Sequence, residues 1–198
     1  MKFEKYPSLV RSDVVAKGSK LNKHLEGNED TWYATEKVHG CNFAIYYDGF
    51  TWRYAKRTAF LDWEDELFEW QDFFTPMQRT KWQYAIRSLR DNWDNGENMD
   101  YYKHIVVYGE FFGGEIQDNV QYEQTLNNTK DFRIFNVFGY KGHNTYDVMG
   151  YDKMKFYFGE ENLVPYITKG KVWDVLRELD MEAESTFGGI SEGYVVQK

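Results

Sequence analysis

One lysine beside a tight turn constrains this chain more than any other feature. Lys37 stands three residues before Gly40 in the run Glu36-Lys37-Val38-His39-Gly40-Cys41-Asn42-Phe43. The flanking segments 32–35 and 44–47 are rich in aromatic and β-branched residues, which favours strands on both sides. A lysine that leaves a strand at such a turn can point into a cleft as a nucleophile. The alternative is a solvated hairpin lysine, and the short pattern alone favours that alternative.

A nucleophilic lysine needs help from its surroundings. The unperturbed pKa of lysine is about 10.4, so little neutral amine exists near pH 7. Desolvation or neighbouring positive charge lowers that pKa. The rest of the chain therefore decides between the two interpretations of Lys37.

Four further segments follow Lys37 in a definite order. Arg53–Thr58 is a basic strand end, and residues 106–114 form an apolar strand that closes on Glu110 and glycines. Residues 131–138 are rich in aromatic side chains, and residues 192–196 are a last strand that opens on Glu192-Gly193. Each segment combines strand-forming residues with a charged or aromatic side chain within the predicted strand or at its end.

In this order, the segments resemble motifs I, Ia, III, IIIa and IV of the covalent nucleotidyltransferases, which include ATP-dependent ligases and capping enzymes. The chain is most similar to the RNA ligase 2 family, whose members include phage RNA ligases and kinetoplastid RNA-editing ligases. The segments that carry the similarity are Lys5–Leu9, Glu36–Phe43, Ala55–Thr58 and Gly109–Val120. Five ordered motifs are far more specific than any one of them.

The resemblance implies an ATP-dependent RNA ligase core. Lys37 attacks the α-phosphate of ATP and displaces pyrophosphate, AMP then passes from lysyl-AMP to an RNA 5′-phosphate, and a 3′-hydroxyl seals the strand. A divalent metal, Mg²⁺, offsets the phosphate charge. The implied partners are ATP and RNA ends, in a nicked duplex, with no membrane and with the protein as a monomer.

The resemblance also assigns the site residues, with Lys37 as the catalytic residue. Glu36 is expected at the adenine edge, Phe135 stacked on adenine, and Arg57 on a phosphate or ribose oxygen. Phe132 and Phe138 are the competing core phenylalanines. The implied nucleotide-binding set is Glu36, His39, Gly40, Asn42, Lys56, Arg57, Glu110, Phe135 and Lys198, and the implied metal set is Glu192 and Glu110.

Two departures from the family pattern leave alternatives open. The position five residues after Glu192 usually holds lysine, but here it is Gln197, and Lys198 comes one residue later. In an alternating strand that shift puts Lys198 on the opposite face. Residues 1–198 are expected to form a single adenylyltransferase domain that ends at motif IV, without motif V or a C-terminal domain, and this predicts impaired sealing.

Three functions follow from these observations. The first is the RNA ligase core, and the second is a non-catalytic nucleotide-binding or interaction module that keeps the fold. A DNA ligase or capping enzyme is disfavoured by His39 and by the matches at Lys5–Leu9 and Gly109–Val120.

Composition limits the partners and the compartment. The net charge of −8 argues against a broad basic surface for nucleic acid. A local cluster remains at Arg53, Lys56 and Arg57, whereas Arg79, Lys81, Arg87 and Arg90 fit a solvated helix face. The single cysteine, Cys41, excludes an internal disulfide and favours a reducing cytoplasm, which is the host's if a phage encodes the chain. Cys41 is interpreted as a small buried residue, with a reactive thiol as the alternative.

The expected fold is α+β: a nucleotidyltransferase (ATP-grasp-like ligase) core of antiparallel sheets with flanking helices. No signal peptide or membrane-spanning apolar window is recognised. Trp82, Ile86, Leu89 and Trp93 are expected in the core at helical spacing. Helices are predicted at 11–25, 62–74, 77–93, 151–158 and 171–180, and strands at 31–37, 42–47, 51–57, 104–112, 132–139 and 190–196, with a hairpin at 139–147.

Overall fold

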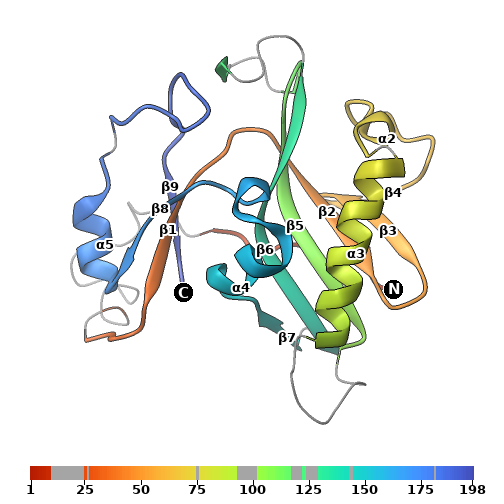
Figure 1. Cartoon of the computed structure of the whole chain (residues 1–198), viewed down its shortest axis with the longest axis horizontal. Coiled ribbons are helices and arrows are strands. Elements are labelled where there is room, and N and C mark those ends of the chain that lie inside the picture. The colour runs from red at the N-terminus through yellow and green to blue at the C-terminus, as the bar shows by residue number, and fades with distance from the viewer. Residues whose placement is uncertain are drawn as a thin grey trace.

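Two antiparallel sheets make up the framework of the molecule (Figure 1). The computed structural model describes residues 1–9, 25, 27–74, 76–92, 102–116, 122–123, 129–142, 145–180 and 182–198. The larger sheet has the strand order β4 (Ala59–Leu61), β3 (Trp52–Lys56), β2 (Cys41–Tyr47), β5 (His104–Gly113), β6 (Lys130–Gly142) and β7 (Thr145–Val148). The smaller sheet has the order β8 (Tyr166–Gly170), β1 (Trp32–Glu36) and β9 (Tyr194–Gln197).

The larger of two core clusters on this sheet lies on the face that the helices cover. Side chains alternate along a strand, so Phe43 and Ile45 of β2 face the helices while Ala44 and Tyr46 face the opposite side. The helices are α2 (Trp70–Phe73), α3 (Pro76–Asn92) and α4 (Tyr151–Phe158), and Figure 1 shows α3 and α4 in front of this sheet. The 3₁₀ turn Glu160–Asn162 follows α4, and α5 (Val172–Glu178) packs on β1 and β8.

The opposite face of the larger sheet is covered by the N-terminal segment, residues 1–9. Met1, Phe3 and Tyr6 pack against the buried cluster that contains Tyr46 and Tyr108. The hydroxyl groups of Tyr46 and Tyr108 both donate to the carbonyl oxygen of Glu4, at 2.7 and 2.8 Å. These bonds fix the segment along the sheet, so that its end, residues 6–9, reaches a cavity lined by strands of both sheets.

The α+β architecture predicted from the sequence is confirmed, and so are most of its elements. Helix α4 has the predicted bounds, and α3 begins at Pro76, a residue suited to the first turn of a helix. Trp82, Ile86 and Leu89 are buried as expected. The prediction for Trp93 lies outside the described residues, as do the helix predicted at 11–25, apart from Leu25, and the loop at 94–98.

Two predicted elements were wrong in extent, and backbone conformation explains both. The helix predicted over 62–74 covers only Trp70–Phe73, because Phe68 and Glu69 have φ values of 51° and 52°, which interrupt a right-handed helix. The last strand begins at Tyr194 rather than at 190, after Gly193 with φ 129°. Strands β4 and β8 were not predicted; both lie at sheet edges, and β4 has only three residues.

Candidate active site

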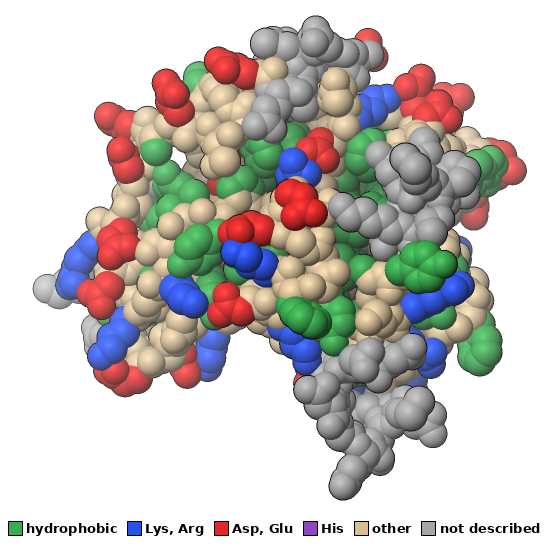
Figure 2. Space-filling view, in the orientation of Figure 1, with side chains coloured by type: hydrophobic (Ala, Val, Ile, Leu, Met, Phe, Trp, Pro, Cys, Tyr) green, Lys and Arg blue, Asp and Glu red, His purple; other side chains and the backbone are tan. Residues whose placement is uncertain are grey.

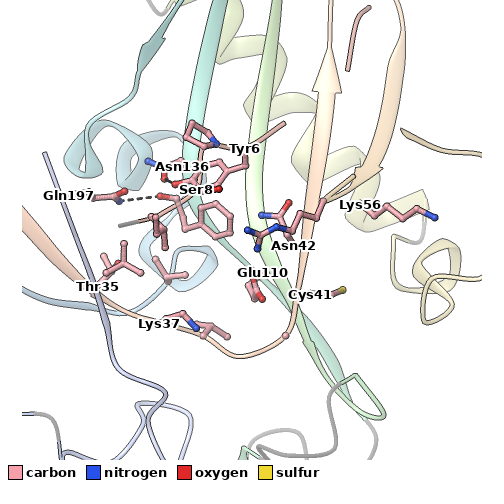
Figure 3. A pocket seen from close by; sticks show the side chains of 18 of the residues that line it. Tyr6, Ser8, Thr35, Lys37, Cys41, Asn42, Lys56, Glu110, Asn136 and Gln197 are labelled. Atoms are coloured by element: carbon pink, nitrogen blue, oxygen red, sulfur yellow. Dashed lines mark hydrogen bonds between the residues drawn. The ribbon is translucent and has the colours of Figure 1, made fainter. Parts of the chain in front are cut away.

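A cavity of about 560 Å³ is lined by strands of both sheets and by the N-terminal segment (Figure 3). The smaller sheet contributes β1 and β9, and the larger sheet contributes β2, β3, β5 and β6. Eight of the predicted site residues line this cavity: Glu36, Lys37, Gly40, Asn42, Lys56, Arg57, Glu110 and Phe135. Segments far apart in the sequence therefore meet at one place.

Lys37 leaves the end of β1 and enters the cavity. Its backbone N–H donates to the carbonyl oxygen of Gly193 at 2.8 Å, which ties the start of the turn to the segment before β9. Its ammonium group pairs with the carboxylate of Glu192. Desolvation lowers the pKa of Lys37, and the Glu110 carboxylate acts in the opposite direction. Partial burial therefore moves this amine toward the neutral form that a nucleophile requires.

Glu192 also contacts His39, two residues after Lys37 in the same turn. The second carboxylate oxygen of Glu192 lies 3.0 Å from Nδ1 of His39. Neither residue belongs to the lining of the cavity itself. The predicted metal residue and the predicted motif I histidine thus sit together at its edge, beside Lys37.

Gly40 is required by a close approach of two backbones. A Cβ at this position would collide with the carbonyl oxygen of Phe111 on β5. The backbone N–H of His39 donates to the hydroxyl of Tyr122 at 2.8 Å, which holds the same turn from another side. Glycine lets the chain pass close to the sheet, and the turn can then carry Lys37 toward Glu110.

Glu110 lies on β5 directly opposite Asn42 of β2, so the two side chains share a face. Burial raises the pKa of Glu110 to about 7, although Lys37, the Gly40 N–H and Arg57 stabilise its charged form. Burial also raises the pKa of Cys41 to about 12. That thiol stays protonated at neutral pH, which supports the interpretation of Cys41 as a packing residue rather than a reactive one.

A β-bulge in β6 directs Phe135 into the cavity. Tyr108 pairs with Asn136 and Gly109 pairs with Ile134, so Phe135 is the extra residue. Phe132 and Phe138 are buried in the two core clusters. The structure therefore separates one half-buried phenylalanine that lines the cavity from two core phenylalanines in the same strand.

Glu36 lines the cavity, and its side chain also has partners that the sequence did not indicate. Its side chain is buried, and its carboxylate accepts hydrogen bonds from the hydroxyl of Ser185 and from the backbone N–H of Thr186, the latter at 2.9 Å. Ser185 and Thr186 belong to the loop that leads to Glu192. The motif gave no indication of this partner, because it lies 149 residues away in the sequence.

Lys198 lies outside the lining of the cavity. Its ammonium group pairs with Asp30 at 2.5 Å and is largely exposed. Gln197 instead lines the cavity, together with Val195, as alternation along β9 requires. Lys198 is therefore not retained in the site.

Several lining residues were missed by reasoning from the motifs. Tyr6 and Ser8 come from the N-terminal segment, and Asn136 follows Phe135. The match at Lys5–Leu9 was the available indication for Tyr6 and Ser8, but it assigned no function to either residue. The remaining missed residues are Pro7, Leu9, Thr35, Val38, Cys41, Thr58, Leu67, Val164, Val195 and Gln197.

The carboxylates fit a divalent metal that arrives with phosphate groups. Within the part of the chain that the structure describes, no group of three or more His, Cys, Asp or Glu residues converges as a metal cage. Glu192 contacts Lys37, and Glu110 interacts with it electrostatically. Mg²⁺ commonly uses one or two carboxylates together with substrate phosphates and water, so two carboxylates beside the lysine suit it.

Comparison with known proteins places the chain in a family. Residues 30–198 match the RNA ligase family, and the chain belongs to that family. A segment of 89 residues is 35% identical to the mitochondrial RNA-editing ligase 2 of Trypanosoma brucei brucei, covering 44% of this chain and 20% of that protein.

Solved structures share the fold at low sequence identity. A mutant of Naegleria gruberi RNA ligase with ATP and manganese matches 98% of this chain and 52% of that one, with a TM-score of 0.66 and 15% identity. The same ligase with pyrophosphate matches 99% of this chain and 52% of that one, with a TM-score of 0.66 and 16% identity. The chain thus spans about half the length of the solved relatives. None of the helices among the described residues is long and apolar enough to cross a membrane.

Proposed function

We propose that this chain is the nucleotidyltransferase core of an ATP-dependent RNA ligase of the RNA ligase 2 type. The observation that carries the proposal is the position of Lys37, partly desolvated at the cavity edge, with Glu192, Glu110, Arg57 and Phe135 around it. Family membership supports the same reaction class.

In the first step, Nζ of Lys37 loses a proton to solvent water, and the neutral amine forms a bond to the α-phosphorus of ATP. The bond from that phosphorus to the pyrophosphate oxygen breaks, and the electron pair leaves with pyrophosphate. Arg57 stabilises the α-phosphate oxygens, and Phe135 stacks on the adenine. Glu192 and Glu110 are the residues that would hold Mg²⁺, which supplies charge neutralisation on the phosphates when bound.

In the later steps, AMP moves from Lys37 to an RNA 5′-phosphate, and a 3′-hydroxyl then displaces AMP. A nicked duplex is the proposed substrate, the protein acts as a monomer, and the proposed compartment is the cytoplasm. On the face shown in Figure 2, acidic and basic side chains are interspersed, without one broad basic patch. With a net charge of −8, RNA affinity is expected to be weak and to fall steeply with added salt.

Intact-mass spectrometry after incubation with ATP and Mg²⁺ tests the first step. A covalent AMP adduct on Lys37 is expected, and Lys37→Ala and Lys37→Arg should both abolish it, since a guanidinium group remains protonated. Lys171→Ala is a matched control, because Lys171 is exposed and pairs with Glu29 away from the cavity. An adduct that maps to Lys56 would contradict the assignment. Nucleotide binding without any adduct would favour the non-catalytic module.

A further inference from the structure

The lining of the cavity divides into a charged end and an uncharged end. Lys37, Lys56, Arg57 and Glu110 lie toward the motif I turn and β3. Figure 3 shows Gln197, Asn136, Tyr6 and Ser8 close together on the other side. Phosphates are stabilised by cations, whereas a base prefers uncharged surfaces and aromatic faces. The base of a bound nucleotide therefore belongs at the uncharged end, against Phe135.

Glu36, the residue expected at the base edge, already accepts two hydrogen bonds within the protein. Both of its carboxylate oxygens accept hydrogen bonds, one from Ser185 and one from Thr186. These bonds hold a buried carboxylate, so breaking them to bind a base would cost free energy. Each carboxylate oxygen keeps a further lone pair, and the polar groups at the uncharged end of the cavity can add to recognition of the base.

Gln197 offers a hydrogen-bond acceptor of fixed orientation at that end. Its amide nitrogen donates to the carbonyl oxygen of Phe135 at 3.3 Å. A backbone carbonyl can only accept, so this bond determines which way the amide is turned. It leaves Oε1 as the acceptor available to a ligand, beside the second N–H of the amide. Because Gln197 is bonded to the backbone of Phe135 and both residues line the cavity, a base stacked on that ring would lie near this amide.

Asn136 supplies the complementary donor. Its Oδ1 accepts from the Tyr6 hydroxyl at 2.6 Å, and burial raises the pKa of Tyr6 to about 12, so this hydroxyl keeps its proton. The amide nitrogen of Asn136 remains as the donor. One acceptor and one donor match the amine at position 6 and the ring nitrogen N1 of adenine.

We propose that Gln197 determines the base specificity of this site, with its side-chain carbonyl accepting a hydrogen bond from the exocyclic amine of adenine. The inference rests on the proposed function, because it names how that nucleotide site recognises its base. It concerns a residue at which this chain departs from the lysine that the family pattern predicts.

Calorimetric titration with two nucleotides tests the proposal. The probes are AMP and purine riboside 5′-monophosphate, which lacks only the amine and, like AMP, cannot adenylylate the lysine. The unmodified chain should bind AMP at least about 10-fold more tightly, the usual effect of one lost hydrogen bond at a buried polar group. In Gln197→Leu the two affinities should agree to within about 2-fold, as expected when one partner of an interacting pair is removed.

A matched control is Gln71→Leu. The amide nitrogen of Gln71 also donates to a backbone carbonyl, that of Trp63, at 2.5 Å, but Gln71 is not part of the cavity. This variant should keep the full preference for AMP. Gln197→Met, whose side chain is similar in length, repeats the test should Gln197→Leu fail to fold.

The outcomes separate this proposal from the one on which it rests. Equal affinities in the unmodified chain, or a preference for AMP that persists in both Gln197 variants, would overturn the role of Gln197 alone. Failure of the unmodified, folded chain to bind either nucleotide would overturn the proposed function as well.

Discussion

At the scale of single residues, burial changes the pKa values of titratable side chains in the cavity. Desolvation acts in opposite directions on Lys37 and Glu110, lowering the pKa of the amine and raising that of the carboxyl group. Both shifts reduce the charge of groups at the edge of one cavity. Perturbed groups gathered in a cavity are typical of functional sites, and here they coincide with the motif residues.

A different buried group, His104, leads to a prediction about stability and pH. Desolvation lowers the pKa of His104 to about 4, with the amino terminus and Lys103 acting in the same direction and Asp48 opposing them. The unfolded chain binds a proton at this side chain below about pH 6.5, whereas the folded chain does not until about pH 4. Stability is therefore lost as the pH falls through this window, by up to about 1.4 kcal/mol per pH unit.

Chemical denaturation at several pH values measures this effect. His104 stacks on Tyr140 with ring centroids 4.7 Å apart, so His104→Phe keeps an aromatic ring there without a titrating group. The variant should lose less stability than the unmodified chain between pH 6.5 and pH 4. Parallel stability curves for the two proteins would show that His104 does not titrate in this way.

At the scale of elements, the bulge in β6 places Phe135 in the cavity lining, whereas Phe132 of the same strand packs in the core. Phe135→Ala should weaken nucleotide binding by about 1–3 kcal/mol, the usual contribution of one base stacked on an aromatic ring. Phe135→Tyr should largely preserve binding. Phe132→Ala should instead lower the free energy of unfolding by about 3–5 kcal/mol, because Phe132 is buried against Phe43 and Trp82.

Titration calorimetry and urea unfolding of both alanine variants separate these effects. Loss of binding in a stable Phe132→Ala, together with loss of stability in Phe135→Ala, would mean that the two rings exchange roles.

The loop between α5 and β9 is the element that brings Glu192 to Lys37. Ser185 donates to the buried carboxylate of Glu36 from within this loop. Ser185→Ala leaves that carboxylate short of one donor, and the free energy of unfolding should fall by about 1–3 kcal/mol. The control is Ser191→Ala, because the Ser191 hydroxyl bonds within the same loop: it accepts from the Gly193 N–H at 3.2 Å and donates to the Gly193 carbonyl oxygen at 3.5 Å. Urea titration should show the larger loss for Ser185→Ala, and equal losses would argue against a special role for the Glu36 contact.

Sequence reasoning succeeded where the information was local. The lysine turn, the strands beside it and the helix Tyr151–Phe158 follow from residue patterns within a few positions. It failed where partners are distant, since Tyr6 and Asn136 are separated by 130 residues and Glu36 and Ser185 by 149. It also failed at Phe68 and Glu69, whose left-handed backbone is not encoded by glycine. Tertiary contacts decide such positions, and one sequence does not reveal them.

At the scale of the whole molecule, the site exists only because the two sheets are held together. The chain passes from the smaller sheet to the larger one through the Lys37–Gly40 turn, and β9 returns to pair with β1, placing Glu36 opposite Tyr194. The cavity is lined from both sheets, so a nucleotide bound there contacts both. Ligand binding and the stability of the fold are then linked.

This linkage predicts a measurable thermal shift. A ligand at about 100 times its dissociation constant stabilises the folded state by about 2.7 kcal/mol. For a chain of this size each kcal/mol raises Tm by roughly 2–4 °C, so saturating AMP should raise Tm by about 5–11 °C in differential scanning calorimetry. Phe135→Ala should show a much smaller shift at the same AMP concentration, because its affinity is lower. An unchanged Tm for the unmodified chain at AMP concentrations far above those that saturate related nucleotide sites would show that the nucleotide does not bind between the sheets.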